Sequence, residues 1–239
     1  IERLLTAGSV SMLVGDGGSG KTFALLDMAV CVALGKDWLD FETNQSPVLI
    51  VDEESGRARM ADRLNRTLEG HLGDDKTPVF YVSLANTNLY ETDDVNMLNL
   101  TIKKHGAGLV IIDALADVMP GGDENAVRDI QPVFIQLRKI ADDTNAAIIV
   151  IHHSNKAGGF RGSTAMKGAV DLMLLMEAED GLLSFRSEKA RDIEPITFGA
   201  MANHTEGRFY LSESDPKRKT IAVVKSQKYV LSYLNREGT

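Results

Sequence analysis

The stretch GDGGSGKT, from Gly15 to Thr22, guides the interpretation of the whole chain. It matches the pattern G-x-x-x-x-G-K-[ST] and stands between an apolar run, Ser9–Gly15, and a helical pattern, Lys21–Leu34. Glycines at this spacing let successive backbone N–H groups surround phosphate oxygens, and the start of the helix adds partial positive charge. We therefore expect a phosphate-binding loop, with Lys21 reaching the β- and γ-phosphates of a nucleotide.

The same motif predicts the residues that hold ATP and Mg²⁺. A second apolar run, LVIID, ends in Asp113, at the position where an aspartate holds the Mg²⁺ shell in P-loop proteins. Thr22 would ligate the metal through its hydroxyl, so Thr22 and Asp113 are the expected metal residues. The expected nucleotide-binding residues are Gly15, Asp16, Gly17, Gly18, Ser19, Gly20, Lys21, Thr22 and Phe23.

A catalytic carboxylate is expected outside the LVIID segment. The residue after Asp113 is Ala114, where many ATPases have a glutamate that activates water. The segment VDEES offers Glu53 and Glu54 instead, at the end of a predicted strand, where ligands bind in open α/β sheets. Adjacent strand residues point to opposite faces, so only one of the two faces the site. Either carboxylate could orient or deprotonate the attacking water.

Apolar runs and helical patterns alternate along the chain and predict an α/β fold. The predicted strands are Ser9–Gly15, Pro47–Asp52, Val79–Ser83, Leu109–Asp113 and Ala146–Ile151. The predicted helices are Lys21–Leu34, a helix from Ser55 as its cap to Gly70, Asp94–His105, and Glu124–Thr144 with Asp123 as its cap. Continuous apolar strands separated by helices indicate a mainly parallel sheet with helices on both faces. Closely spaced runs at Leu172–Met176, Leu182–Ser187, Pro195–Phe198 and Arg208–Leu211 predict an antiparallel C-terminal extension.

Composition sets limits on the function. We expect residues 1–212 to form the core, and residues 213–239 a linker and the start of a helical element. The net charge of −8 means that binding to nucleic acid must use local positive patches.

The single cysteine, Cys31, fits a reducing compartment. The longest apolar run, near Leu25–Leu34, is broken by Asp27 and is too short to cross a bilayer. With no signal-peptide pattern at Ile1, we expect a cytoplasmic protein without a membrane partner.

Two adjacent histidines end the last predicted parallel strand and precede a basic loop. In IVIHHSNKAGGFRGS, from Ile149 to Ser163, adjacent histidines of a strand point to opposite faces and make a poor chelating pair. No acidic residue occurs from Ile151 to Val170, while Lys156, Arg161 and Lys167 are basic. This flexible positive segment suits contact with a single-stranded DNA backbone. The alternative is an ordinary surface loop.

The motifs, in this order, resemble those of the RecA-like ATPases. The resemblance is closest to hexameric helicases of the DnaB and plasmid RepA type and covers roughly Ala7 to Leu211. It implies that Glu54 is the catalytic glutamate and that His153 senses the γ-phosphate. It also implies that the segment GFRGSTAMKGAVD faces a central channel and touches DNA. SEKARDIEP resembles the segment that presents Lys189 and Arg191, the latter as an arginine finger, to the nucleotide of a neighbouring subunit.

The expected protein is therefore a Mg-ATP-hydrolysing motor. The resemblance implies a homo-oligomeric ring, of six subunits, that moves on single-stranded DNA as a helicase or translocase of a plasmid- or phage-type replication system. The first alternative is a regulatory or scaffold RecA-like ATPase, in which ATP controls assembly and partner binding without DNA unwinding. A recombinase-type filament protein is the second.

Overall fold

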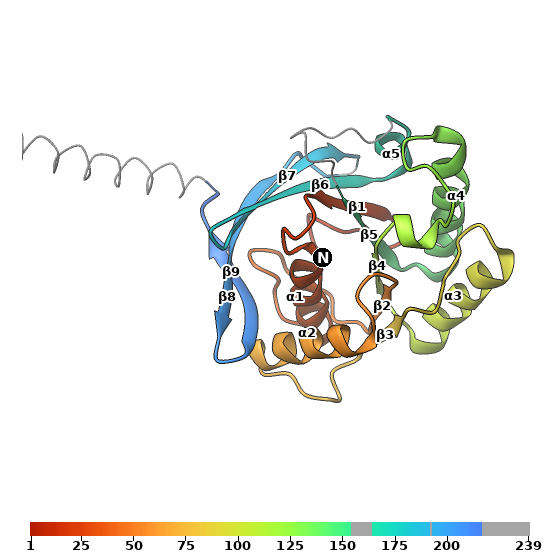
Figure 1. Cartoon of the computed structure of the whole chain (residues 1–239). Coiled ribbons are helices and arrows are strands. Elements are labelled where there is room, and N and C mark those ends of the chain that lie inside the picture. The colour runs from red at the N-terminus through yellow and green to blue at the C-terminus, as the bar shows by residue number, and fades with distance from the viewer. Residues whose placement is uncertain (154–163, 192, 217–239) are drawn as a thin grey trace, which may run out of the picture.

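The computed structural model describes residues 1–153, 164–191 and 193–216 (Figure 1). Within them, nine strands form one sheet in the order β3-β2-β4-β5-β1-β6-β7-β8-β9. The strands are β1 Val10–Gly15, β2 Val48–Asp52, β3 Val79–Ser83, β4 Leu109–Asp113, β5 Ala147–His153, β6 Leu172–Glu179, β7 Leu182–Ala190, β8 Thr197–Thr205 and β9 Arg208–Ser214. The helices are α1 Lys21–Leu34, α2 Arg57–Gly70, α3 Thr92–His105, the 3-10 turn η1 Ala116–Val118, α4 Val127–Thr144 and α5 Thr164–Ala169.

The sheet has the predicted class: a parallel part with an antiparallel extension. Strands β1 to β5 pair in parallel, and β6 to β9 pair with one another antiparallel. All residues of β1, β2 and β4 are buried, as expected for parallel strands with helices on both faces. Strand β6 pairs in parallel with β1 on its other side. It is therefore the strand at which the sheet changes direction, and not simply part of the extension.

Two hydrophobic cores lie on the two faces of the sheet. Helices α1 and α2 cover one face, and α3, α4 and α5 cover the other (Figure 1). The alternation along β1 divides its side chains between the cores, with Leu13 in the first and Met12 and Val14 in the second. Burial on both faces holds β1 in place, and the phosphate loop begins at the end of that strand.

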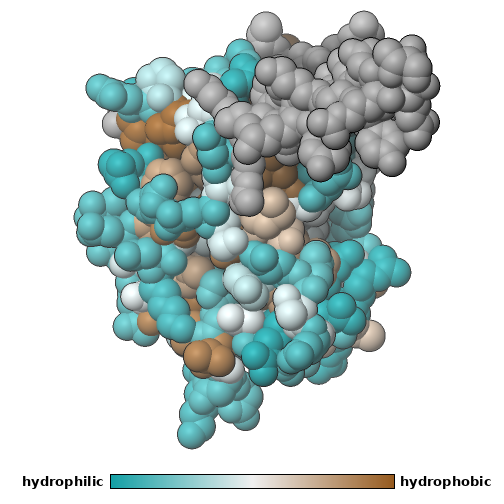
Figure 2. Space-filling view, turned by 90° about the vertical axis from the view of Figure 1, so that its left-hand side faces the viewer, coloured by the Kyte–Doolittle hydropathy of each residue, from teal (hydrophilic) through white to brown (hydrophobic). Residues whose placement is uncertain are grey.

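The antiparallel strands curve beside α1 and bring β9 against α2 (Figure 1). A Cβ at Gly70 would lie 2.0 Å from the carbonyl oxygen of Phe209, so only glycine fits at this contact. On the side of the molecule where β8 and β9 lie, hydrophilic residues cover most of the visible surface outside the grey atoms. Hydrophobic residues there show only in separate small areas (Figure 2).

Several element boundaries differ from the sequence prediction. Helix α2 begins at Arg57 after Gly56 (φ 86), and Ser55 does not cap it. Helix α4 begins at Val127, because Asp123 Oδ1 accepts hydrogen bonds from Asn125 instead of capping the helix. Strand β8 is longer than predicted because β7 and β9 pair with it on its two sides, which gives small and polar residues ladder partners. None of the helices in the described parts of the chain is long and apolar enough to cross a membrane.

Candidate nucleotide-binding site

The phosphate loop connects β1 to α1 at the carboxyl edge of the sheet. Gly18 (φ 77) and Gly20 (φ 89) take left-handed backbone conformations that favour glycine. A side chain at Gly15 would place its Cβ 2.5 Å from the Met176 carbonyl oxygen. The sequence pattern therefore forms the tight backbone loop that phosphate binding requires.

Lys21 lies folded over this loop. Its Nζ donates to the carbonyl oxygens of Gly15 and Asp16, each at 2.8 Å. Burial lowers the pKa of Lys21, while the carboxylates of Asp113, Glu54 and Asp16 oppose that shift. When a nucleotide binds, the buried Lys21 ammonium group can exchange these two carbonyl oxygens for phosphate oxygens while its side chain stays at the loop.

The residues expected to hold Mg²⁺ lie together. Thr22 Oγ1 donates to Asp113 Oδ2 at 2.7 Å, while Asp113 Oδ1 is buried and has no partner among the described residues. In the loop itself, Ser19 Oγ is likewise buried without a described partner. The Thr22 hydroxyl and the Asp113 carboxylate, whose Oδ1 has no described partner, are oxygen ligands of the kind that a hard cation prefers. The donor set therefore suits Mg²⁺. Burial raises the pKa of Asp113 to about 6, and the carboxylates of Glu54 and Asp52 add to the rise.

The two glutamates after β2 have different surroundings. The Glu53 carboxylate accepts from the backbone N–H groups of Asn86 and Thr87, both at 3.0 Å, and so fixes the loop after β3. Glu54 Oε2 lies 3.2 Å from His153 Nε2, and its side chain is 48% exposed. Of the pair, Glu54 is the one whose carboxylate lies beside the phosphate-loop residues.

His153 links Glu54 to Lys21. Its Nδ1 lies 3.3 Å from Lys21 Nζ and its Nε2 faces Glu54. A lysine ammonium only donates and a carboxylate only accepts, so in these two contacts Nδ1 is the acceptor toward Lys21 and Nε2 the donor toward Glu54. The other histidine, His152, is buried and its Nδ1 lies 3.1 Å from Glu124 Oε1. The two rings thus have separate partners, and only His153 contacts the candidate site.

One acidic residue of this region was not identified from the sequence. Asp117 lies in η1, four residues after Asp113. Partial burial raises the pKa of Asp117, the Ala114 N–H opposes the rise, and Glu54 adds to it. The available signal was its position in the turn after β4, the strand that ends in the expected metal residue Asp113.

The predicted basic residues lie away from the phosphate loop. Lys189 is the last residue but one of β7, and Arg191 directly follows that strand. Its last residue, Ala190, pairs with Leu172, which in turn pairs with Ser11 near the start of β1. The phosphate loop follows the opposite end of β1, so this pair cannot complete the site of its own chain. Lys167 Nζ, in α5, donates to Glu188 Oε2 at 3.1 Å. The other predicted DNA contacts, Lys156 and Arg161, lie outside the described residues.

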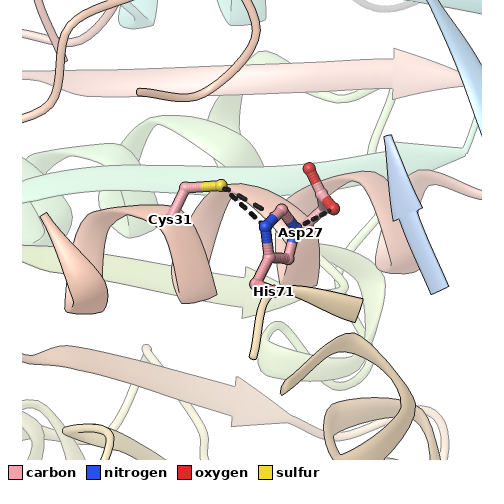
Figure 3. A group of neighbouring side chains, drawn as sticks. All are labelled: Asp27, Cys31 and His71. Atoms are coloured by element: carbon pink, nitrogen blue, oxygen red, sulfur yellow. Dashed lines mark hydrogen bonds and ion pairs between the residues drawn. The ribbon is translucent and has the colours of Figure 1, made fainter. Parts of the chain in front are cut away.

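A second polar group is formed by Asp27 and Cys31 of α1 and by His71 at the end of α2 (Figure 3). Asp27, Cys31 and His71 have potential ligand atoms within 4.8 Å of one another. However, His71 Nε2 is already 2.6 Å from Asp27 Oδ1, and the Asp27 carboxylate also accepts from Trp38 Nε1 and from the backbone N–H of Leu211. Burial is the main cause that raises the pKa of the Cys31 thiol. The raised pKa disfavours the thiolate, which is the form that binds a metal. This donor set fits a hydrogen-bond network better than a metal site.

Comparisons with known proteins agree with the fold and the motifs. The AAA domain family matches residues 1–159, more than half of the chain. The DNA repair protein RadA of Streptococcus pyogenes serotype M6 is 26% identical over 175 residues, 72% of this chain and 34% of that protein. RadA of Streptococcus pneumoniae is 25% identical over 72% of this chain and 36% of its own length. RadA of Aquifex aeolicus is 23% identical over 73% and 35%.

The chain thus spans about a third of the length of these curated relatives. The family match includes the phosphate loop, the VDEES segment and the LVIID strand. The chain belongs to the AAA domain family and is a RecA-like P-loop ATPase domain.

Proposed function

We propose that this chain is the motor domain of a ring-forming ATPase that moves on single-stranded DNA in a plasmid- or phage-type replication system. The observation that carries the proposal is the contact chain from Lys21 through His153 to Glu54. It lies beside the Thr22–Asp113 pair at one edge of the sheet. This edge thus combines a phosphate-binding group, a metal-binding pair and a carboxylate.

The first part of the proposed mechanism is nucleotide binding. The backbone N–H groups of Gly17 to Thr22 surround the phosphates, and Phe23 lies next to them at the start of α1. Lys21 exchanges the carbonyls of Gly15 and Asp16 for the β- and γ-phosphates. Thr22 and Asp113 would hold Mg²⁺, which neutralises charge on the phosphates when it is bound.

The second part is hydrolysis. Glu54 accepts a proton from the attacking water, whose oxygen forms the new bond to the γ-phosphorus as the bond to the β-phosphate oxygen breaks. The hydrogen on His153 Nε2, now given to Glu54, becomes available to a γ-phosphate oxygen. His153 therefore changes its partner when ATP is bound, and it lies at the end of the strand that leads into the basic segment.

The third part is a contribution from a neighbouring subunit. Lys189 and Arg191 lie at the edge of the sheet opposite to the phosphate loop, so a ring can bring the segment that carries this pair beside the next subunit's nucleotide. A cation at this point stabilises the negative charge of the transition state. The site is then complete only in the oligomer.

Contact with DNA is supported by the sequence and by the named relatives. Lys156, Arg161 and Lys167 lie in a stretch without acidic residues, within a chain of net charge −8. The curated relatives carry the name DNA repair protein. One observation favours the alternative of a regulatory or scaffold ATPase: Lys167 is already engaged by Glu188 of its own chain.

The proposal predicts that single-stranded DNA raises ATP turnover several-fold and that the protein forms a closed ring. The measurements are steady-state ATPase rates with and without DNA, and particle mass by light scattering. Lys21→Ala is the control, because it should abolish the basal and the stimulated rate together. A monomer or dimer whose turnover ignores DNA would contradict the motor and favour the regulatory ATPase.

A pH dependence follows from Asp113. Because its pKa is about 6 without metal, Mg-ATP must displace a proton below that pH. We expect the Kd of Mg-ATP to rise by about tenfold per pH unit below pH 6. Calorimetric titrations between pH 5 and 7.5 measure this dependence. A Kd that stays constant across this range would contradict it.

Two controls separate this effect from unfolding and from titration of the nucleotide. The raised pKa means that the folded state binds the proton more tightly than the unfolded chain. Protonation of Asp113 therefore stabilises the folded state as the pH falls from about 6 toward 3.8, the ordinary pKa of an aspartate. Thermal unfolding without Mg²⁺ should accordingly show no fall in Tm from this group over that pH range. Asp113→Asn should bind Mg-ATP weakly throughout and retain only the titration of the nucleotide.

A further inference from the structure

The two cations of the proposed trans pair are held in different ways. Lys189 Nζ donates to the carbonyl oxygen of Lys167 at 2.6 Å and to that of Gly168 at 3.4 Å. Arg138, from α4, donates through Nε and Nη2 to the carbonyl oxygen of Ala169. Two basic side chains thus bind the last carbonyls of α5, where the helix end carries partial negative charge. Lys189 therefore stabilises the end of α5 in its own subunit.

Arg191 is held by a carboxylate. Its Nη1 donates to Asp171 Oδ1 at 2.7 Å, and its backbone N–H donates to the Asp171 carbonyl oxygen at 3.0 Å. Side chain and main chain are therefore both aligned on the same residue. The Arg191 side chain remains 51% exposed, and a guanidinium has five N–H donors. Within the described parts of the chain only the bond to Asp171 uses one of them, so the others can reach another ligand.

Asp171 is itself fixed to the start of β1. Its Oδ2 accepts from the backbone N–H of Val10 at 3.0 Å, and its own N–H donates to the Val10 carbonyl oxygen at 2.7 Å. Since both carboxylate oxygens are engaged, the group cannot rotate without breaking one of these bonds. Asp171 therefore presents a fixed acceptor to Arg191 from the central part of the sheet.

We propose that Asp171 is a positioning residue that orients Arg191 toward the nucleotide of the neighbouring subunit, while Lys189 holds α5. This inference rests on the trans role in the proposed function. A long arginine side chain loses rotational freedom when it binds a phosphate, and an acceptor that already restrains it reduces that loss. The carboxylate also leaves the positive charge close to the subunit surface, where a neighbour can reach it.

The first test is a double-mutant cycle on kcat. Asp171→Asn keeps an oxygen for Val10 but loses the charge that holds Arg191, and we expect kcat to fall between about ten- and a hundredfold with KM little changed. In an Arg191→Ala background, the same substitution should cause no further loss. Additive losses would overturn the positioning role. If Arg191→Ala alone leaves kcat unchanged, the trans role of Arg191 in the proposed function is wrong. This outcome can be told apart from additive losses, which overturn only the positioning role of Asp171.

The second test introduces the Asp171 substitution into only one of two kinds of subunit in a mixed ring. Mixing Glu54→Gln subunits with Arg191→Ala subunits should restore activity, because the first supply Arg191 and the second supply Glu54. Adding Asp171→Asn to the Glu54→Gln chain should remove this rescue, and adding it to the Arg191→Ala chain should leave it. Equal effects in both placements would overturn the inference. If the Asn variant does not fold, Asp171→Glu, which moves the carboxylate, should give the same asymmetry.

Discussion

Replacing Glu54 with Gln should lower kcat by about 10²- to 10⁴-fold, with little change in KM for ATP. The amide keeps the shape of the side chain and its contact distance to His153, but it cannot take a proton from water. Nucleotide binding rests on Lys21, Thr22 and the loop backbone, which the substitution leaves in place. Single-turnover hydrolysis and equilibrium binding of a fluorescent ATP analogue separate the two effects.

Glu53→Gln is the matched control, because it makes the same chemical change one residue away. The Glu53 carboxylate accepts from the backbone of Asn86 and Thr87. Loss of its charge should lower the free energy of unfolding by about 1–3 kcal/mol and leave kcat close to that of the wild type. The reverse outcome, a large fall in kcat for Glu53→Gln alone, would move the catalytic role to Glu53.

The difference between these glutamates illustrates what the sequence could and could not predict. Strand alternation predicted that only one of them faces the site, but β2 ends at Asp52 and both glutamates lie in the bend that follows it. Which one faces the site depends on the loop after β3, whose N–H groups lie more than thirty residues further along the chain and bind Glu53. Contacts of that range depend on tertiary packing, which residue patterns do not encode.

The fold class could be predicted because the strands are buried on both faces. Runs such as LVIID and PVLIVD are continuous and apolar, and this pattern has few explanations other than a covered parallel sheet. The length of β8 could not be predicted, since its residues Gly199–Asn203 have weak strand character by themselves. Its hydrogen bonds to β7 and β9 determine its extent.

Asp27 was visible in the sequence only as an interruption of an apolar helix. In the structure it is 1% exposed and accepts from the side chains of Trp38 and His71 and from the main chain of Leu211. These donors belong to the segment after α1, the end of α2 and strand β9. A single carboxylate thus connects three parts of the chain that are distant in sequence.

Asp27→Ala should therefore lower the free energy of unfolding by about 3–5 kcal/mol, because it leaves buried donors without an acceptor. Denaturant unfolding measured by circular dichroism gives this value. Asp142→Ala, at an exposed position in α4, should stay within about 0.5 kcal/mol of the wild type. Asp27→Asn keeps the shape and one acceptor oxygen, so its loss should be smaller than that of the alanine variant.

A chelator distinguishes this network from a metal site. If Asp27, Cys31 and His71 act through hydrogen bonds, EDTA should leave the unfolding transition of the wild type unchanged, and added Zn²⁺ should not raise it. A metal site predicts that EDTA lowers Tm and that Zn²⁺ restores it, with the effect absent in Cys31→Ala. The carboxylate, which already binds an indole N–H and a backbone N–H, favours the first result. The loss expected for Asp27→Ala then measures how strongly β9 and the end of α2 are held to α1.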